Sequence, residues 1–255
     1  MIALEKVRKV FLSPENEEVV AVNDVSLDVP SGETLCLIGS SGCGKTTTMK
    51  LVNRLIEPTD GKIYVGGQDV SEQNAIQLRK RIGYVIQKGG LFPHMTVSRN
   101  VAVLCELEGW SPERQKQRAE ELLTLVNLAP DEFAHRYPRE LSGGQRQRVG
   151  VARALALDPE YILMDEPFGA LDPITRKQLH EEFLALNQKV QKTIILVTHD
   201  MDEAFLLGKR IGLMDRGKIV QIGTEDDFRE RPANDFVRKF LQQHLNKGTE
   251  DVTPN

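Results

Sequence analysis

Short runs of apolar residues alternate along the chain with segments whose apolar positions recur every three or four residues. Unbroken apolar runs predict buried β-strands at Thr34–Ile38, Tyr161–Met164 and Thr193–Thr198. Other β-like runs are Ile2–Val7, Val19–Val22, Val25–Val29, Lys62–Val65, Gln68–Val70, Gly83–Ile86 and a hairpin over Ile211–Ile222. Helical spacing predicts Lys45–Arg54, Val97–Leu107, Pro112–Val126, Gly143–Leu157 and Ile174–Val190.

Buried strands that alternate with helices predict an α/β fold with a mainly parallel sheet covered on both faces. The N-terminal strands come before this alternation, and the segment from about Lys88 to Leu157 is mostly helical. No repeat or flexible linker interrupts the sequence, so we expect one domain over residues 1–246 and a polar tail over 247–255. In such a sheet ligands bind beyond the carboxyl ends of the strands.

Composition narrows the class of protein. The 255 residues include 33 Lys and Arg and 37 Asp and Glu, for a net charge of −4, which argues weakly against a nucleic-acid partner. The three cysteines, Cys36, Cys43 and Cys105, lack zinc-ligand spacing and are expected to be free thiols. No apolar run approaches the roughly 18 residues of a membrane span, and charges interrupt the N-terminus, so we expect an intracellular protein.

A glycine-rich segment follows the first buried strand and precedes a helix. It matches the pattern G-x-x-x-x-G-K-[ST], in which glycines let backbone N–H groups surround phosphate oxygens at a helix N-terminus. Lys45 is expected to reach the β- and γ-phosphates, and the Thr46 hydroxyl to bind Mg²⁺. The expected phosphate-binding residues are Gly39, Ser40, Ser41, Gly42, Cys43, Gly44, Lys45, Thr46 and Thr47.

Polar residues also follow three other strands. Asp165 could hold Mg²⁺ through water, while Glu166 could polarise the water that attacks the γ-phosphate. His199 could reach the γ-phosphate, and Gln87 could offer its amide to Mg²⁺ or to the attacking water. In isolation each has an ordinary structural reading: a solvated acidic turn, a structural histidine or a surface glutamine. The phosphate loop favours the catalytic reading.

The segment Leu141–Gln145 opens a helix with two adjacent glycines. Ser142 and Gln145 form a capping-box pattern, which by itself predicts only a well-started helix. Gly143 and Gly144, however, cost about 1 kcal/mol each relative to Ala, which suggests that the backbone closely approaches another group. A helix N-terminus of this kind could bind a γ-phosphate.

Taken in order, these motifs resemble the nucleotide-binding subunit of ATP-binding cassette (ABC) transporters. The resemblance rests on the phosphate loop, Gln87, Leu141–Gln145, Tyr161–Glu166, Ala170-Leu171-Asp172 and His199, over about Phe11 to Ile222. It implies a P-loop core with a mainly parallel sheet, an N-terminal antiparallel β subdomain and a helical subdomain inserted at about residues 88–157.

The resemblance also implies how such a protein would work. Two copies would sandwich ATP head to tail, so that Ser142, Gly143, Gly144 and Gln145 bind the nucleotide of the other copy, with Asp172 acting across the same interface. Asp172 followed by Pro173 is equally a good helix start. Phe11 stands where the family places an aromatic on adenine, although packing in the core is an equally good reading.

The resemblance further implies partners: ATP and Mg²⁺ as cofactors, two membrane permease subunits, an extracytoplasmic solute-binding protein acting indirectly, and a location on the cytoplasmic face of the membrane. The lobe from Lys88 to Leu157 would contact the permease. The segment Gly89–Met95 is suited to transmit the conformational change to the permease, and the alternative is an ordinary packed loop.

Closer similarity points to bacterial osmoprotectant importers, which take up glycine betaine, carnitine, choline and related quaternary amines. The similarity lies in Thr46–Lys50, Asn53–Pro58, Gly83–Gln87, Gly90–His94 and Asp165–Thr175. Many members of that group carry a C-terminal pair of regulatory CBS domains, which these 255 residues do not contain.

Three alternatives remain open at this point. The protein could serve an importer of another small solute, or be a soluble ABC ATPase that acts on nucleic acid or ribosomes. The latter class usually has two cassettes or long coiled-coil insertions, and this sequence has one phosphate loop and no heptad run. An inactive scaffold is the third reading, against which stand Lys45, Asp165, Glu166 and His199.

Overall fold

The computed structural model describes residues 1–87, 90–169 and 171–245. Two compact units make up the chain: Met1–Ala75 together with Thr193–Asn255, and Ile76–Lys192. Lys88, Gly89, Ala170 and the tail predicted over 247–255 lie outside the described residues.

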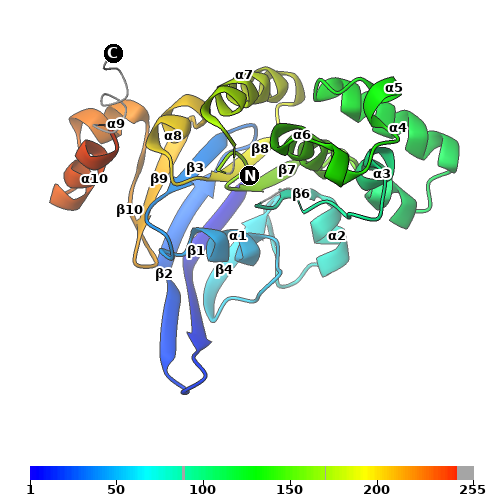
Figure 1. Cartoon of the computed structure of the whole chain (residues 1–255). Coiled ribbons are helices and arrows are strands. Elements are labelled where there is room, and N and C mark those ends of the chain that lie inside the picture. The colour runs from blue at the N-terminus through cyan, green and yellow to red at the C-terminus, as the bar shows by residue number, and fades with distance from the viewer. Residues whose placement is uncertain (88–89, 170, 246–255) are drawn as a thin grey trace, which may run out of the picture. The chain divides into compact units, whose positions relative to one another are not determined.

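The first unit contains an antiparallel sheet in the order β2-β1-β4-β5, as the family resemblance implied for the N-terminal part of the chain. Figure 1 shows β1 and β2 as a long paired ribbon with a free tip. The strands are β1 (Ile2–Leu12), β2 (Glu18–Val29), β4 (Asp60–Val65) and β5 (Gln68–Asp69).

The prediction of separate short strands at Val19–Val22 and Val25–Val29 is wrong, because both belong to the continuous strand β2. The apolar alternation breaks at Asn23 and Asp24, where the register against β1 shifts between the pairs Val7↔Val25 and Lys9↔Val22. Asp24 takes up the extra residue with a φ of 55°. A β-bulge therefore looks like a strand boundary in the sequence pattern.

The first unit also holds four strands in the order β10-β9-β3-β8, in which β9, β3 and β8 are parallel and β10 is antiparallel to β9. Every residue of β3 and β8 is buried, as expected for strands covered on both faces. The elements are β3 (Thr34–Ile38), β8 (Thr193–Val197), β9 (Arg210–Asp215), β10 (Lys218–Gly223), α1 (Lys45–Val52), α8 (Met201–Leu207), α9 (Glu225–Glu230) and α10 (Asp235–Leu245).

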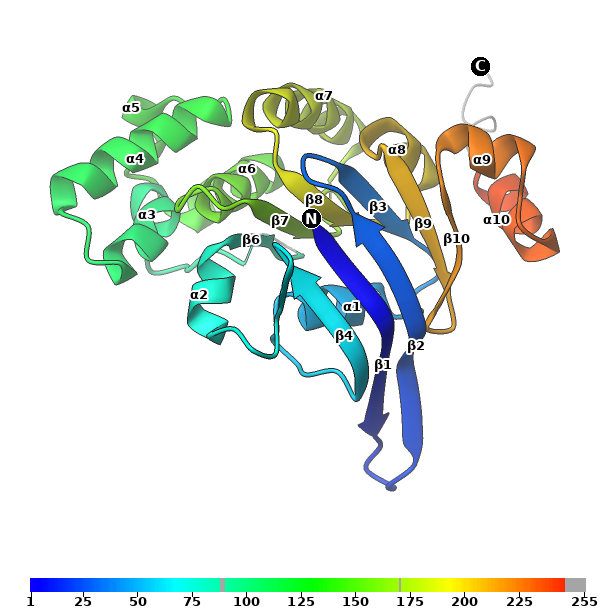
Figure 2. The ribbon, with the colours of Figure 1, turned by 180° about the vertical axis from the view of Figure 1, so that it is seen from behind.

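The second unit pairs two parallel strands, β6 and β7, with a group of helices. Figure 2 shows α3, α4 and α5 gathered beside α6. The elements are α2 (Ala75–Lys80), β6 (Ile82–Val85), α3 (Val97–Leu107), α4 (Pro112–Leu125), α5 (Pro130–Phe133), a 3₁₀ turn at Pro138–Glu140, α6 (Gly143–Ala154), β7 (Tyr161–Asp165) and α7 (Pro173–Val190). The helices α3 to α6 fall within the range proposed for a helical subdomain.

Several of these helices begin at a side-chain cap. Thr96 accepts a hydrogen bond from the backbone N–H of Arg99 at the start of α3, and Ser111 does the same for Arg114 at the start of α4. Such caps satisfy N–H groups that the first helical turn leaves without intrahelical partners. Within the described ranges, none of the helices combines the length and hydrophobicity that crossing a lipid bilayer requires.

Candidate nucleotide site

The glycine-rich segment forms a turn between β3 and α1 in the first unit. Gly44, the N-cap of α1, has a φ of 109° and provides no side-chain hydrogen bond to the helix start. No side chain therefore caps the start of α1, and the positive end of the helix dipole favours an anion there.

Lys45 lies over this turn. Its Nζ donates to the carbonyl oxygens of Gly39 at 2.7 Å and Ser40 at 3.0 Å, and lies 3.7 Å from Cys43 Sγ. The side chain is buried, so the ammonium is fixed where the turn surrounds it. A phosphate bound in the turn would meet a positioned cation rather than a flexible one.

Two glycines of this turn provide a matched pair of substitutions. A Cβ on Gly39 (φ +143°) would lie 2.1 Å from the Met214 carbonyl oxygen, whereas one on Gly42 (φ +77°) would meet nothing within 4 Å. We expect Gly39→Ala to lower the free energy of unfolding by about 2–4 kcal/mol. Gly42→Ala should cost only about 1–2 kcal/mol, the strain of a left-handed backbone. Urea unfolding of both variants measures the difference, and equal losses would show that the contact with Met214 is not a constraint.

The other candidate residues of the first unit lie in two places: Thr46, Thr47 and His199 follow its parallel strands, and Phe11 lies on the hairpin of β1 and β2. Leu37 of β3 pairs with Val197 of β8, so the phosphate turn and the exposed His199 follow the same carboxyl edge of these strands. Thr46 and Thr47 are half-buried in the first turn of α1.

Phe11 lies on β1 and is 40% exposed, with Lys9 Nζ 5.1 Å from its ring centre. The reading of Phe11 as a core residue is therefore wrong. An exposed aromatic ring is available for stacking.

In the second unit, the strand ends bring Gln87 and Glu166 together. Val85 pairs with Met164, so both residues stand two positions beyond paired residues, and Gln87 Nε2 donates to Glu166 Oε2 at 2.7 Å. Glu166 has a φ of 44°, which is uncommon for a residue with a side chain. Strain of this kind concentrates at functional sites.

Asp165 is the last residue of β7 and is buried. Burial and the nearby Asp165 charge raise the pKa of Tyr84 to about 12. The side chains proposed for Mg²⁺, Thr46, Gln87 and Asp165, offer hydroxyl, amide and carboxylate oxygens, the donors that Mg²⁺ prefers. The Gln87 amide nitrogen donates to Glu166, which turns the amide oxygen away from that carboxylate.

The helix α6 starts with both bonds of the capping box. Ser142 Oγ accepts from the Gln145 N–H at 3.2 Å, and Gln145 Oε1 accepts from the Ser142 N–H at 2.8 Å. The close neighbours of the two glycines lie within the same chain: a Cβ on Gly144 would sit 2.7 Å from Thr175 Cγ2, and one on Gly143 3.2 Å from Leu171 Cδ2. These glycines therefore let α6 approach the start of α7, and Ser142 remains exposed.

Asp172 is the N-cap of α7, where its carboxylate accepts from the Thr175 N–H at 3.0 Å. Hydrogen bonds from this backbone hold the pKa of Asp172 below its usual value. Asp172 therefore caps α7, one of the two roles considered for it. Its action across a dimer interface stays a prediction.

The segment from Gly90 to Thr96 is held by two residues that the sequence analysis missed. Asn100 is fully buried; its Oδ1 accepts from the Phe92 N–H at 2.8 Å, and its Nδ2 donates to the carbonyls of Phe92, Met95 and Thr96 at 3.0–3.1 Å. Arg153 of α6 donates to the Gly90 carbonyl at 2.9 Å and lies 5.8 Å from the Phe92 ring centre. The spacing of residues in the sequence does not predict contacts of this kind between a loop and a helix.

The candidate site thus divides between the two units. The phosphate loop, Phe11 and His199 belong to the first, and Gln87, Ser142, Asp165, Glu166 and Asp172 belong to the second. That these two groups of residues bind the same nucleotide remains a prediction.

Comparisons with known proteins extend this picture. The profile of the ABC transporter family matches residues 22–169. The glycine betaine/carnitine/choline transport ATP-binding protein OpuCA of Bacillus subtilis (strain 168) is 54% identical over 94% of this chain and 62% of its own length. The osmoprotectant import ATP-binding protein OsmV of Salmonella typhimurium is 50% identical over 95% of this chain and 64% of its own.

The chain therefore spans a little under two thirds of the length of these relatives. A solved structure described as a dimeric, post-hydrolysis state of an ATP-binding cassette bound to ADP and Pi is similar with a TM-score of 0.79 and 34% identity. The similarity covers 88% of this chain and 98% of that one.

Proposed function

Because the chain belongs to the ABC transporter family, we propose that it is the ATP-hydrolysing subunit of a bacterial importer for a quaternary-amine osmoprotectant such as glycine betaine, carnitine or choline. The observation that carries this proposal is the 54% identity to OpuCA over 94% of the chain. Two further relatives are named as transport proteins for choline and for carnitine.

The proposed reaction assigns a role to each group. Lys45 and the loop N–H groups bind the β- and γ-phosphates, and Phe11 stacks on adenine. Glu166 accepts the proton of the attacking water while Gln87 orients that water and His199 contacts the γ-phosphate. Thr46, Gln87 and, through water, Asp165 would hold Mg²⁺, and the ion when bound would supply positive charge to the phosphate oxygens.

Two copies would bind two ATP molecules head to tail. Ser142, Gly143, Gly144 and Gln145 of one copy would close over the nucleotide held by the phosphate loop of the other. The cassette that resembles this chain is described as dimeric with ADP and Pi bound, which supports this arrangement. ATP would favour the closed dimer because only that state offers the γ-phosphate its second set of contacts.

The dimer would act on two permease subunits from the cytoplasmic face of the membrane, and a solute-binding protein would deliver solute on the other side. Deleting the gene in its source organism should abolish uptake of labelled glycine betaine, choline or carnitine at high osmolarity. A plasmid carrying the parent gene should restore uptake, and one carrying the Glu166→Gln variant should not. Unchanged uptake of all three would contradict the solute assignment, and purification with RNA instead of membrane subunits would contradict the transport role.

The segment from Gly90 to Met95 is proposed to contact the permease. Phe92 is 41% exposed although its backbone is held by Asn100. We expect Phe92→Ala to leave ATP hydrolysis by the isolated chain unchanged and to lower solute uptake, because the substitution removes an exposed contact without loosening the segment. Leu91→Ala should act in the same direction. Parent-level uptake by both variants in membrane vesicles would exclude this segment from coupling.

A further inference from the structure

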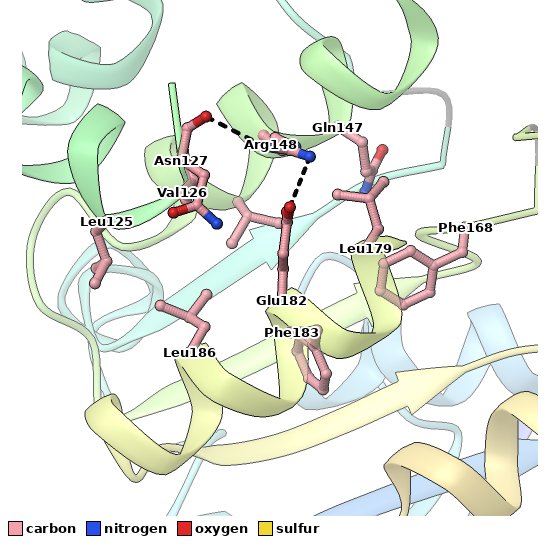
Figure 3. Close-up of a pocket in the computed structure, with 11 residues that line it drawn as sticks. Leu125, Val126, Asn127, Gln147, Arg148, Phe168, Leu179, Glu182, Phe183 and Leu186 are labelled. Carbon is pink, nitrogen blue, oxygen red and sulfur yellow. Dashed lines mark hydrogen bonds and ion pairs between the residues drawn. The ribbon is translucent and has the colours of Figure 1, made fainter. Parts of the chain in front are cut away.

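A small cavity of about 40 Å³ lies in the second unit between α6, α7 and the residues that follow α4 (Figure 3). Phe168, Leu179 and Phe183 are among the apolar side chains that line it. Gln147 of α6 also lines the cavity and is 5% exposed, and its Nε2 has no hydrogen-bond partner within the described ranges. Side-chain packing alone therefore leaves a gap between the two helices here.

One ion pair connects α6 and α7 beside this gap. Arg148 Nη2 donates to Glu182 Oε1 at 2.8 Å, and only 15% and 21% of these side chains are exposed (Figure 3). Arg148 Nη1 also donates to the Asn127 carbonyl at 3.3 Å, and Gln178 Nε2 donates to Glu182 Oε1 at 3.2 Å. The planar guanidinium thus ties α6 both to α7 and to the residues that follow α4, which an ammonium could do less well.

The pair is placed about one helical turn from the start of α6. Nearer that start, Gly144 packs on Thr175, so α6 is held against α7 at two points along its length. Ser142 caps α6 and Asp172 caps α7. The position of these two exposed caps relative to each other therefore depends on how α6 lies against α7.

We infer that Arg148 is a positioning residue: through Glu182 it holds α6 against α7 so that Ser142 and Asp172 are presented together to the nucleotide of a second copy. This inference rests on the proposed function, because it assumes that Ser142 acts across a dimer. Partial burial makes the pair stronger than an exposed one, and the neighbouring cavity leaves few other contacts that could replace it.

The test compares full-length variants in three measurements: ATP turnover, ATP-induced dimerisation in the Glu166→Gln background, and affinity of dilute chain for a fluorescent ATP analogue. We expect Arg148→Met to lower turnover about tenfold and to weaken dimerisation by a similar factor. Affinity for the analogue should change by less than about twofold, because the phosphate loop lies in the other unit. A purely structural defect would instead lower thermal stability without this selective loss.

A double-mutant cycle separates positioning from general damage. Glu182→Gln should cause losses in the same measurements, and the double variant should lose no more than Arg148→Met alone, because Arg148→Met already breaks the link to Glu182. Arg148→Lys, which keeps the charge, should recover part of the turnover. The control is Arg136→Met, which removes an exposed pair with Glu132 of the same 2.8 Å length and should change nothing.

Unchanged turnover in Arg148→Met, or additive losses in the double variant, would overturn the inference while leaving the proposed function intact. If Arg148→Met does not fold, Glu182→Gln and Arg148→Lys decide by the same measurements. A parent chain that binds no ATP would overturn the proposed function and this inference with it.

Discussion

Replacing Glu166 by glutamine is expected to lower ATP hydrolysis by about 10²–10⁴-fold while ATP and Mg²⁺ still bind. Glutamine keeps the shape of the side chain but cannot accept the proton of the attacking water at neutral pH. The structure places this carboxylate at a strained strand end, with a φ of 44° and a 2.7 Å hydrogen bond from Gln87. Steady-state phosphate release measures turnover, and a fluorescent ATP analogue measures binding.

A suitable control lies at the other end of the same strand. Glu160 precedes β7 and forms an exposed ion pair with Arg81, so Glu160→Gln should leave turnover unchanged. Turnover of Glu166→Gln close to that of the parent would show that another group removes the proton.

Replacing Lys45 by alanine is expected to weaken ATP binding by about 100-fold, the effect of losing charged hydrogen bonds to phosphate from a buried site. The ammonium is buried and donates to the Gly39 and Ser40 carbonyls, so its removal also frees the turn that surrounds the phosphates. Equilibrium titration with an ATP analogue measures the change.

Lys50→Ala provides the matched comparison, because Lys50 is exposed on the last turn of the same helix α1. Binding by this variant should equal that of the parent. If both lysine variants bound ATP equally well, the glycine-rich turn would not be the phosphate site.

Lys45, Glu166 and His199 could be predicted because each comes after a strand that is buried along its whole length. Unbroken apolar runs predicted the strands β3, β7 and β8 to within a residue or two. The parallel register of β6 with β7 accounts for the contact between Gln87 and Glu166. The α/β class was predicted from the alternation of buried strands with helices, whereas the antiparallel N-terminal strands were expected from the family resemblance. The short helices α2 and α8 were missed, because six or seven residues show too little periodicity.

Contacts that depend on three-dimensional packing could not be predicted. The glycines Gly143 and Gly144 signalled a close approach, yet the sequence does not reveal that α7 of the same chain is the neighbour. The buried Asn100 and the pair Arg148–Glu182 look like ordinary polar positions on helices, since nothing local indicates what they face. The left-handed backbone of Glu166 is likewise invisible in a sequence.

The most direct test of the account is the mass of the Glu166→Gln chain in solution with and without ATP and Mg²⁺. Light scattering should report the 28.6 kDa of one chain without nucleotide and twice that mass with it, and adding Ser142→Arg should prevent the change. A Glu166→Gln chain saturated with ATP that keeps the mass of a single copy at every concentration would contradict the shared nucleotide site.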